Sequence, residues 1–187
     1  MSQNGDQLIY KVEEGEVEGC YLRYCGEIDL PSLATKIGVT AFMFFRNLTK
    51  VYLPPTISEI GACAFSGCEN LVAVVDKDMT NPMQEAYRND LTCIVLPRLV
   101  TKIEPQCFME CYRFENVIIP PAVWSIGEGA FFKCLGLKRL VIPNTVTEIG
   151  RNAFALCKNL DYVMVGRANY RSIRNDIPSG ARIDFLD

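Results

Sequence analysis

The chain repeats itself every 23 residues, and this period constrains the fold more than any other feature. Residues 48–70 read LTKVYLPPTISEIGACAFSGCEN, and residues 137–159 read LKRLVIPNTVTEIGRNAFALCKN. The leucine, the proline, the Ile-Gly pair, the Ala-Phe pair and the cysteine stand at identical positions in both segments. A unit this short cannot bury its apolar side alone, so its copies must stack on one another. The sequence therefore predicts a solenoid with one continuous core.

The repeat runs through most of the chain. A shortened, irregular unit occupies residues 71–90, where DKDMTNPM replaces the proline segment. Residues 160–165 form a half unit that supplies one more strand. We expect residues 25–165 to form the repeat domain, residues 1–24 an N-terminal cap, and residues 166–187 a C-terminal cap. The five full units are residues 25–47, 48–70, 91–113, 114–136 and 137–159.

Each part of the unit predicts a local structure. The L-x-x-V-x-I segment alternates around β-branched residues and predicts a short strand, which must run parallel to the strand of the next unit. The proline that follows has no N–H to donate and ends the strand. The Ile-Gly pair supplies a buried residue and then a position free to take positive φ, before a helical turn over A-F-x-x-C. We expect a stack of buried rings from Phe42, Phe65, Phe108, Phe131 and Phe154.

This pattern resembles the BspA-type leucine-rich repeats, whose units read roughly L-x-x-V-x-I-P-x-x-V-x-x-I-G-x-x-A-F-x-x-C. Roughly three quarters of the chain fits the pattern. The resemblance implies a leucine-rich-repeat solenoid of the α/β repeat class. Its curved parallel β-sheet would form the concave face, and short helical or 3₁₀ turns would form the convex face. It also implies that partners bind through the concave sheet.

The nine cysteines fit the repeat better than they fit a disulfide framework. Phe45 occupies the cysteine position of the first unit, so that position requires an apolar residue, and a free cysteine behaves as a small hydrophobic residue. The odd total and the lack of a signal peptide in this sequence predict reduced thiols. A bridge such as Cys111 to Cys134 is the alternative, because adjacent coils lie close together. The cysteines at this position are Cys68, Cys111, Cys134 and Cys157.

The composition argues against catalysis and against several kinds of partner. The absence of histidine removes Ser-His and Cys-His nucleophiles and most zinc, copper and haem sites. Asp76, Lys77, Asp78 and Thr80 form an oxygen-rich segment that suits calcium, but the EF-hand spacing is absent. The formal net charge is only −3, without a basic track for nucleic acid or membranes. We predict a protein that is not an enzyme and has no catalytic residue, cofactor or metal.

The sequence also bears on localisation. It contains neither a secretory signal nor an apolar run of the ~20 residues needed to span a membrane. We expect the protein to be cytoplasmic, or secreted or on the cell surface if the full gene product is longer.

One row of strand residues predicts the working surface. Strands ~4.8 Å apart would spread this row over roughly 30 Å, as an exposed apolar strip of the kind that marks an interaction site. Two alternatives stay open: valine and isoleucine favour strands whichever way they face, and a cap or a second copy of the chain could cover the row. The row, here called the central lane, contains Asp29, Tyr52, Val75, Val95, Ile118, Val141 and Met164.

These observations predict a non-enzymatic protein–protein recognition module that binds a macromolecular partner, and inhibits it by occlusion. The alternative, which follows from the resemblance, is a secreted or surface adhesin that binds host or matrix protein. The excursion at residues 76–83 fits either a binding insertion or the decay of a redundant repeat. The predicted partner-binding residues are Tyr52, Val95, Ile118, Arg139, Val141, Tyr162 and Met164.

Overall fold

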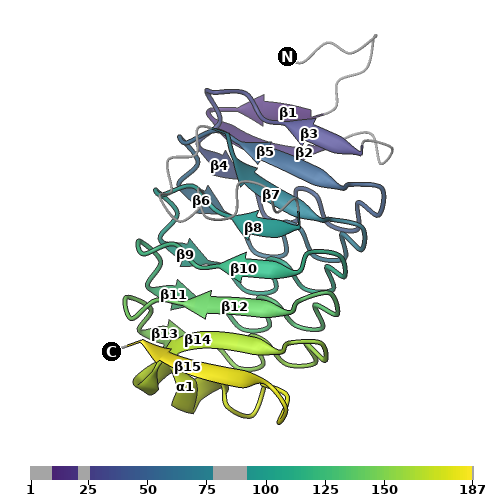
Figure 1. The fold of residues 1–187 in the computed structure, drawn as a ribbon. Helices are drawn as coiled ribbons and strands as arrows, with labels where there is room; N and C mark the ends of the chain where they lie inside the picture. The colour runs from purple at the N-terminus through teal and green to yellow at the C-terminus, as the bar shows by residue number, and fades with distance from the viewer. Residues whose placement is uncertain (1–9, 21–25, 78–91, 187) are drawn as a thin grey trace.

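The computed structural model describes residues 10–20, 26–77 and 92–186, and an eight-stranded sheet forms one side of it (Figure 1). Every pairing in this sheet is parallel, because each coil returns the chain in the same direction. In spatial order, its strands are β15 (Arg182–Leu186), β14 (Tyr162–Gly166), β12 (Arg139–Ile142), β10 (Asn116–Ile118), β8 (Cys93–Val95), β7 (Ala73–Asp76), β5 (Lys50–Leu53) and β3 (Glu27–Asp29).

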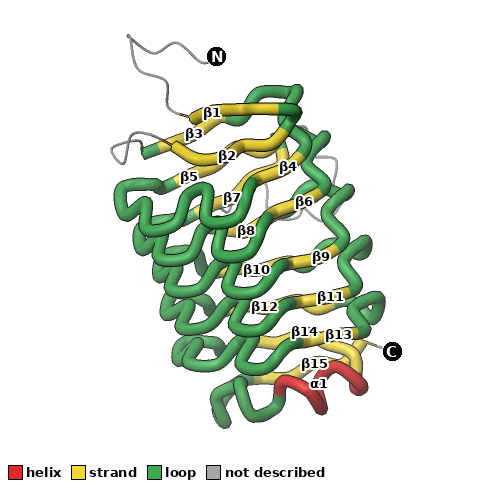
Figure 2. The backbone as a smooth tube through the Cα atoms, turned by 180° about the vertical axis from the view of Figure 1, so that it is seen from behind, coloured by secondary structure: helices red, strands yellow, loops and turns green. Residues whose placement is uncertain are grey.

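A second layer of short strands lies behind this sheet (Figure 2). It forms two sheets, one of four strands and one of three, and only the β1–β2 hairpin is antiparallel among the described pairings. The short helix α1 (Arg167–Ile173) lies at the C-terminal end. The four-stranded sheet contains β1 (Tyr10–Glu13), β2 (Glu16–Cys20), β4 (Lys36–Ile37) and β6 (Glu59–Ile60); the three-stranded sheet contains β9 (Lys102–Ile103), β11 (Ser125–Ile126) and β13 (Glu148–Ile149). The molecule is a parallel β-solenoid, which confirms the predicted fold class.

The predicted phenylalanine stack forms the centre of the core. Successive rings lie 5.3 to 5.4 Å apart between centroids, with interplanar angles of 4 to 11°. All five rings are fully buried. Isoleucine and leucine side chains from both layers of strands surround them. Removing one of the three inner rings would therefore open a cavity between two others.

The segment after each Ile-Gly pair differs from the helical turn that we expected. In the first unit, the N–H of Ala41 donates to the carbonyl of Gly38 at 3.3 Å, but the N–H of Phe42 donates to Ala64 of the next coil at 2.8 Å. The backbone is left-handed at Thr40 (φ 57°) and Phe44 (φ 61°), which prevents a continuous helix. Alternate N–H groups thus bind the same coil and the next coil, and these bonds hold the stack together.

The glycine of the Ile-Gly pair is required by close packing and not by positive φ. A Cβ atom on Gly127 would lie 2.4 Å from the backbone nitrogen of Pro105, and one on Gly150 would lie 2.3 Å from that of Glu128. Neither glycine has a positive φ, so the predicted backbone role was wrong. Two adjacent coils approach too closely here for any side chain.

The repeated cysteines form a ladder of hydrogen bonds along the stack. Each Sγ donates to the carbonyl of a core phenylalanine in the preceding coil, at 3.0 to 3.2 Å. Burial raises the pKa of the Cys68 thiol to about 12 and that of Cys134 well above its ordinary value, so both remain protonated donors. Cys111 and Cys134 are both free. The described free cysteines are Cys63, Cys68, Cys93, Cys107, Cys111, Cys134 and Cys157.

The irregular unit contributes to the sheet but is skipped by the stack. Strand β7 lies between β5 and β8, yet Phe65 stacks directly on Phe108 at 5.4 Å. The N–H of Phe65 likewise donates to the carbonyl of Cys107 at 2.9 Å. The coils at residues 48–70 and 91–113 therefore meet directly on the turn side, while an additional strand separates them on the sheet side. Within the described residues, no strand pairing joins β6 to β9.

Candidate functional site

The outer face of the eight-stranded sheet is the face turned away from the phenylalanine stack, and it presents the central lane. Tyr52 lies beside Val75, Val95 beside Ile118, and Val141 beside Met164. The intervening strand residues, such as Ile28, Val117 and Val163, belong to the main core. The lane therefore has the alignment and orientation that we predicted from the repeat.

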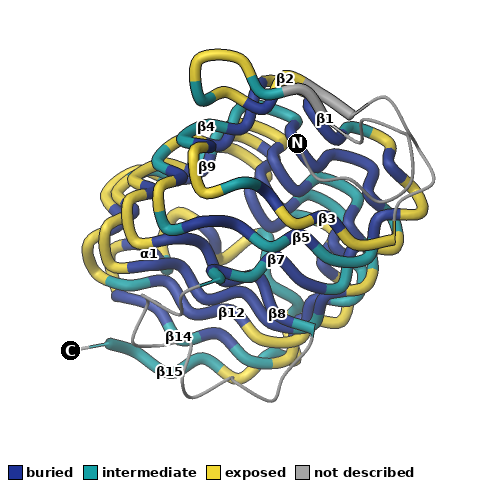
Figure 3. Tube along the Cα trace, turned by 90° about the horizontal axis from the view of Figure 1, so that it is seen from above, coloured by how far each residue is buried: buried dark blue, intermediate teal, exposed yellow. Residues whose placement is uncertain are grey.

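The centre of this lane is buried, which contradicts the expectation of an exposed apolar strip. Val95 is 4% exposed, Ile118 is 2% exposed and Val141 is 9% exposed. Val95 and Ile118 form a second buried cluster with Cys93, separate from the main core. Val95 and Ile118 are cross-strand neighbours in register, and the sequence pattern does not encode which residues of the outer face are buried. Figure 3 shows the buried strands against the exposed turns.

The N-terminal end of the outer face is a network of polar contacts. The Tyr52 hydroxyl donates to Glu27 Oε2 at 3.3 Å, and Lys50 Nζ lies 3.5 Å from Glu27 Oε1. Lys77 forms an ion pair with Asp29. Tyr52 is thus partly exposed, and its hydroxyl is hydrogen-bonded to Glu27. The N-terminal end of the outer face is therefore polar.

The C-terminal end of the outer face is more accessible and has a different composition. Arg139 is exposed, and Tyr162 and Met164 are partly exposed on the neighbouring strand. On β15, Arg182 lies 5.9 Å from the Tyr162 ring centroid and binds Asp184 at 3.1 and 3.2 Å. We call these five residues the C-terminal patch. Arginine, tyrosine and methionine are the residue types enriched in protein interfaces.

Strand β15 extends this patch, and the sequence analysis missed it. Residues 182–186 read RIDFL, with apolar residues at alternate positions, and Tyr162 pairs with Arg182 in register. The repeat pattern ends before this segment, so we assigned it to a cap. The alternation itself was the available signal for a strand.

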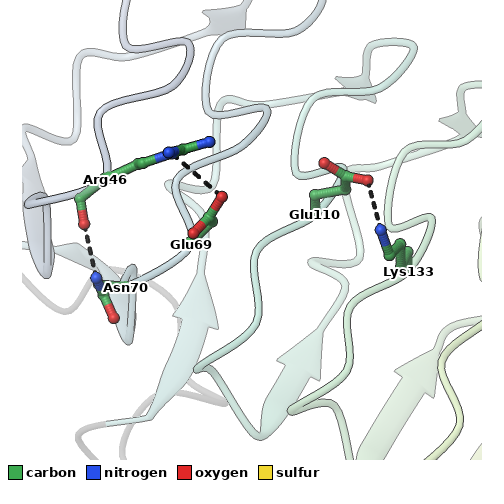
Figure 4. Close-up of polar contacts among 5 residues, drawn as sticks. All are labelled: Arg46, Glu69, Asn70, Glu110 and Lys133. Carbon is green, nitrogen blue, oxygen red and sulfur yellow. Dashed lines mark hydrogen bonds and ion pairs between the residues drawn. The ribbon is translucent and has the colours of Figure 1, made fainter.

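Contacts on the turn side link successive coils (Figure 4). Arg46 Nε lies 3.2 Å from Glu69 Oε1, and Asn70 Nδ2 donates to the Arg46 carbonyl at 2.8 Å. Further along, Lys133 Nζ lies 2.9 Å from Glu110 Oε1, and this hydrogen bond raises the pKa of Lys133. Exposed pairs of this kind contribute little to stability, and they occupy the turns that hold the stack together.

A hollow of about 500 Å³ extends over the second layer of strands, between β6 and β9. Its charged lining alternates in sign: Lys36 lies 3.0 Å from Glu59, and Lys102 lies over the Trp124 ring at 4.5 Å from its centroid. These cations are already engaged by a carboxylate and an aromatic ring.

Within the described ranges, the structure contains no cluster of three or more potential metal-ligating side chains from His, Cys, Asp and Glu. Asp78 and Thr80 of the oxygen-rich segment lie outside the described residues. No helix in residues 10–20, 26–77 or 92–186 has the length and hydropathy needed to cross a membrane.

The family model of the BspA type leucine rich repeat region matches residues 18–89 and 83–183, in six copies. The chain therefore belongs to the BspA-type leucine-rich repeat family. This family and its solved structures support a repeat module for protein interaction. Among curated proteins, none matches the chain.

Two solved structures show the same fold. The chain is similar to a leucine-rich repeat protein of T. pallidum at 27% identity and TM-score 0.65, over 80% of this chain and 62% of that one. It is also similar to the pneumococcal vaccine antigen PcpA at 15% identity and TM-score 0.64, over 95% of this chain and 46% of that one. The chain spans less than two thirds of each.

Proposed function

We propose that this protein is a non-enzymatic recognition module that binds a protein partner through the C-terminal patch. The observation that carries this proposal is the exposure of Arg139, with Tyr162 and Met164, on a sheet whose centre is closed. An accessible group of large side chains on rigid strands loses little conformational entropy on binding. Arginine and tyrosine are also the residue types most often found to dominate binding energy.

Because the centre of the central lane is buried, the proposed contact surface leaves out some of the predicted partner-binding residues. Val95 and Ile118 are closed to a partner, and Tyr52 lies in the polar network at the opposite end. Val141 lies beside Met164 on the outer face and, at 9% exposure, supplies little contact area. The proposed anchors are therefore Arg139, Tyr162 and Met164.

A patch of this kind acts by covering the surface of its partner. A stable complex buries ~800 Å² on each side, more than three side chains provide, so β15 and the adjoining turns must contribute. Arg182 and Asp184 would then form a polar rim around the anchors. If the covered surface is the active site of an enzyme, binding inhibits that enzyme by occlusion.

The same proposal places the protein in the cytoplasm. The buried cysteines of the repeat position, Cys68, Cys111, Cys134 and Cys157, are free thiols, as expected in a reducing compartment. Immunodetection in fractions of the native host tests this part: recovery in the cytoplasmic fraction supports it, and recovery at the cell surface would favour an adhesin.

The test of the patch uses a double variant and a matched control. Arg139→Glu/Met164→Lys changes two anchors, and Arg98→Glu/Leu99→Lys makes the same changes at exposed positions after β8. A partner is first captured from host lysate with the native chain, and its affinity is then measured by calorimetry for all three proteins.

We expect the patch variant to lose about 10-fold or more in affinity, while the control binds as the native chain does. Circular dichroism and the melting temperature should show that both variants are folded. Equal binding by the patch variant and the native chain would contradict the proposal.

A further inference from the structure

Charge is unevenly distributed along the chain, and the solenoid converts this into a difference between its two ends. Residues 1–77 contain ten acidic and six basic residues, for a net charge of −4. Residues 132–187 contain nine basic and five acidic residues, for a net charge of +4. Because each coil adds to one end of the stack, position in the sequence becomes position along the axis. The molecule is therefore acidic at its N-terminal end and basic at its C-terminal end.

The basic end includes a row of arginines on helix α1. Arg167 and Arg171 belong to α1, and Arg174 is its C-cap residue. Their intervals of four and three residues place them on one side of the helix, and all three are exposed. Among the described residues, none of the three forms an ion pair with an acidic side chain. Arg167 lies 4.4 Å from the Phe185 ring centroid, whereas Arg171 and Arg174 are exposed to solvent.

The acidic end includes the β1–β2 hairpin. Glu13, Glu14, Glu16 and Glu18 lie within six residues, and their side chains are exposed. Glu14 (φ 47°) and Gly15 (φ 84°) form a tight two-residue turn that projects this charge. The hairpin and α1 lie at opposite ends of the stack in Figure 1.

We propose that the arginine row of α1 docks on the acidic hairpin of a second copy of this chain, head to tail. Each molecule carries both surfaces, and contact between like ends is repulsive, so charge selects this one arrangement. The interface is heterologous and uses different residues on the two partners, so it leaves a free end on every assembly. It uses a surface separate from the C-terminal patch, and it goes beyond the proposed recognition function.

The association should be weak and sensitive to salt. Exposed ion pairs contribute little individually, and the Debye length falls from about 30 Å at 0.01 M salt to about 8 Å at 0.15 M. Sedimentation velocity at protein concentrations up to about 1 mM should therefore show a rising weight-average mass at low salt. The mass should return to that of the monomer when salt is added.

A charge swap tests the head-to-tail geometry. Arg171→Glu/Arg174→Glu removes the basic surface, and Glu14→Lys/Glu16→Lys removes the acidic one. Each variant alone should remain monomeric at low salt, because it lacks one of the two complementary surfaces. An equimolar mixture should associate again, because each variant supplies the end that the other lacks.

The control is Arg98→Glu/Arg113→Glu. It changes the net charge by as much as Arg171→Glu/Arg174→Glu does, but at exposed positions in the middle of the stack. This variant should associate as the native chain does. A monomeric native chain at low salt would overturn the proposal, as would a mixture of the two end variants that stays monomeric. Native chain that binds heparin beads but does not self-associate would assign the arginines to a polyanion instead.

Discussion

The regular coils of residues 91–159 differ from the junction at β7, where the coils of residues 48–70 and 91–113 meet. The difference is in how the strands of the sheet correspond to the rings of the stack. In the regular coils, each strand in the sheet corresponds to one ring in the stack. At the junction the sheet gains β7, while Phe65 and Phe108 remain in direct contact. The stack, with its hydrogen-bonded turns, therefore stays continuous at the junction, whereas the sheet accepts an additional strand.

The physical reason is the number of contacts and hydrogen bonds that a gap in the stack or an additional strand in the sheet would remove. A gap in the stack would expose two phenylalanine faces and the N–H groups that bind the next coil, and both losses are costly. An additional strand in the sheet pairs with both neighbours, over four positions with β5 and at Val74 with β8. The irregular unit thus changes the sheet without breaking the core.

The largest expected effect comes from removing a ring on either side of this comparison. Phe131→Ala, in the regular stack, should lower the free energy of unfolding by ~3–5 kcal/mol, because both ring faces lose their partner. Phe65→Ala should cost a similar amount, because Phe65 also lies between two rings. Urea denaturation measures both. A much smaller cost for Phe65→Ala would mean that the stack is open at the junction.

The glycines give the next largest effect. Gly127→Ala places a Cβ atom 2.4 Å from the Pro105 nitrogen, so adjacent coils must separate, and we expect a loss of ~1–3 kcal/mol. Gly38→Ala should cost less, because its closest backbone contact would be 3.0 Å and its closest atom belongs to the flexible Glu16 side chain. Thermal unfolding ranks the two variants. Equal melting temperatures would argue against close coil packing as the reason for the glycines.

The end of the stack gives the smallest effect. No coil follows Phe154, and its N–H donates instead to Asp176 Oδ2 at 3.2 Å. Asp176→Ala removes this acceptor and should cost about 1 kcal/mol, whereas Asp176→Asn keeps an acceptor oxygen and should retain the stability of the native chain. Denaturation at pH 7 compares them. Equal losses in both variants would show that the carboxylate charge, and not the hydrogen bond, matters.

The raised pKa of Asp176 also determines the sign of its effect on stability as the pH changes. Burial raises the pKa of its carboxyl group, and the Phe154 hydrogen bond opposes this only in part. The folded protein therefore binds this proton more tightly than the unfolded chain, so the contribution of Asp176 to stability falls as pH rises through the raised pKa. Asp176→Asn should remove that part of the slope in the acidic range, above the ordinary carboxyl pKa of 3.8. An unchanged slope would contradict the assignment.

The features that could be predicted from the sequence are those that the repeat period determines directly. The five stacked rings, the parallel strands and the alignment of Tyr52 with Val75 follow from equal spacing. Burial on the outer face did not follow, since Val95 and Ile118 fit the pattern of an exposed row. Strand β15 was missed because it pairs in register without carrying the repeat.

Amide exchange at Phe65 shows directly whether the coils of residues 48–70 and 91–113 meet on the turn side. Its N–H donates to Cys107 across the junction at 2.9 Å, as the N–H of Phe108 donates to Ala130 within the regular coils at 2.8 Å. Two-dimensional NMR after transfer to D₂O compares the two amides in one sample. We expect similar protection for both, whereas rapid exchange at Phe65 beside slow exchange at Phe108 would show that the coils do not meet directly there.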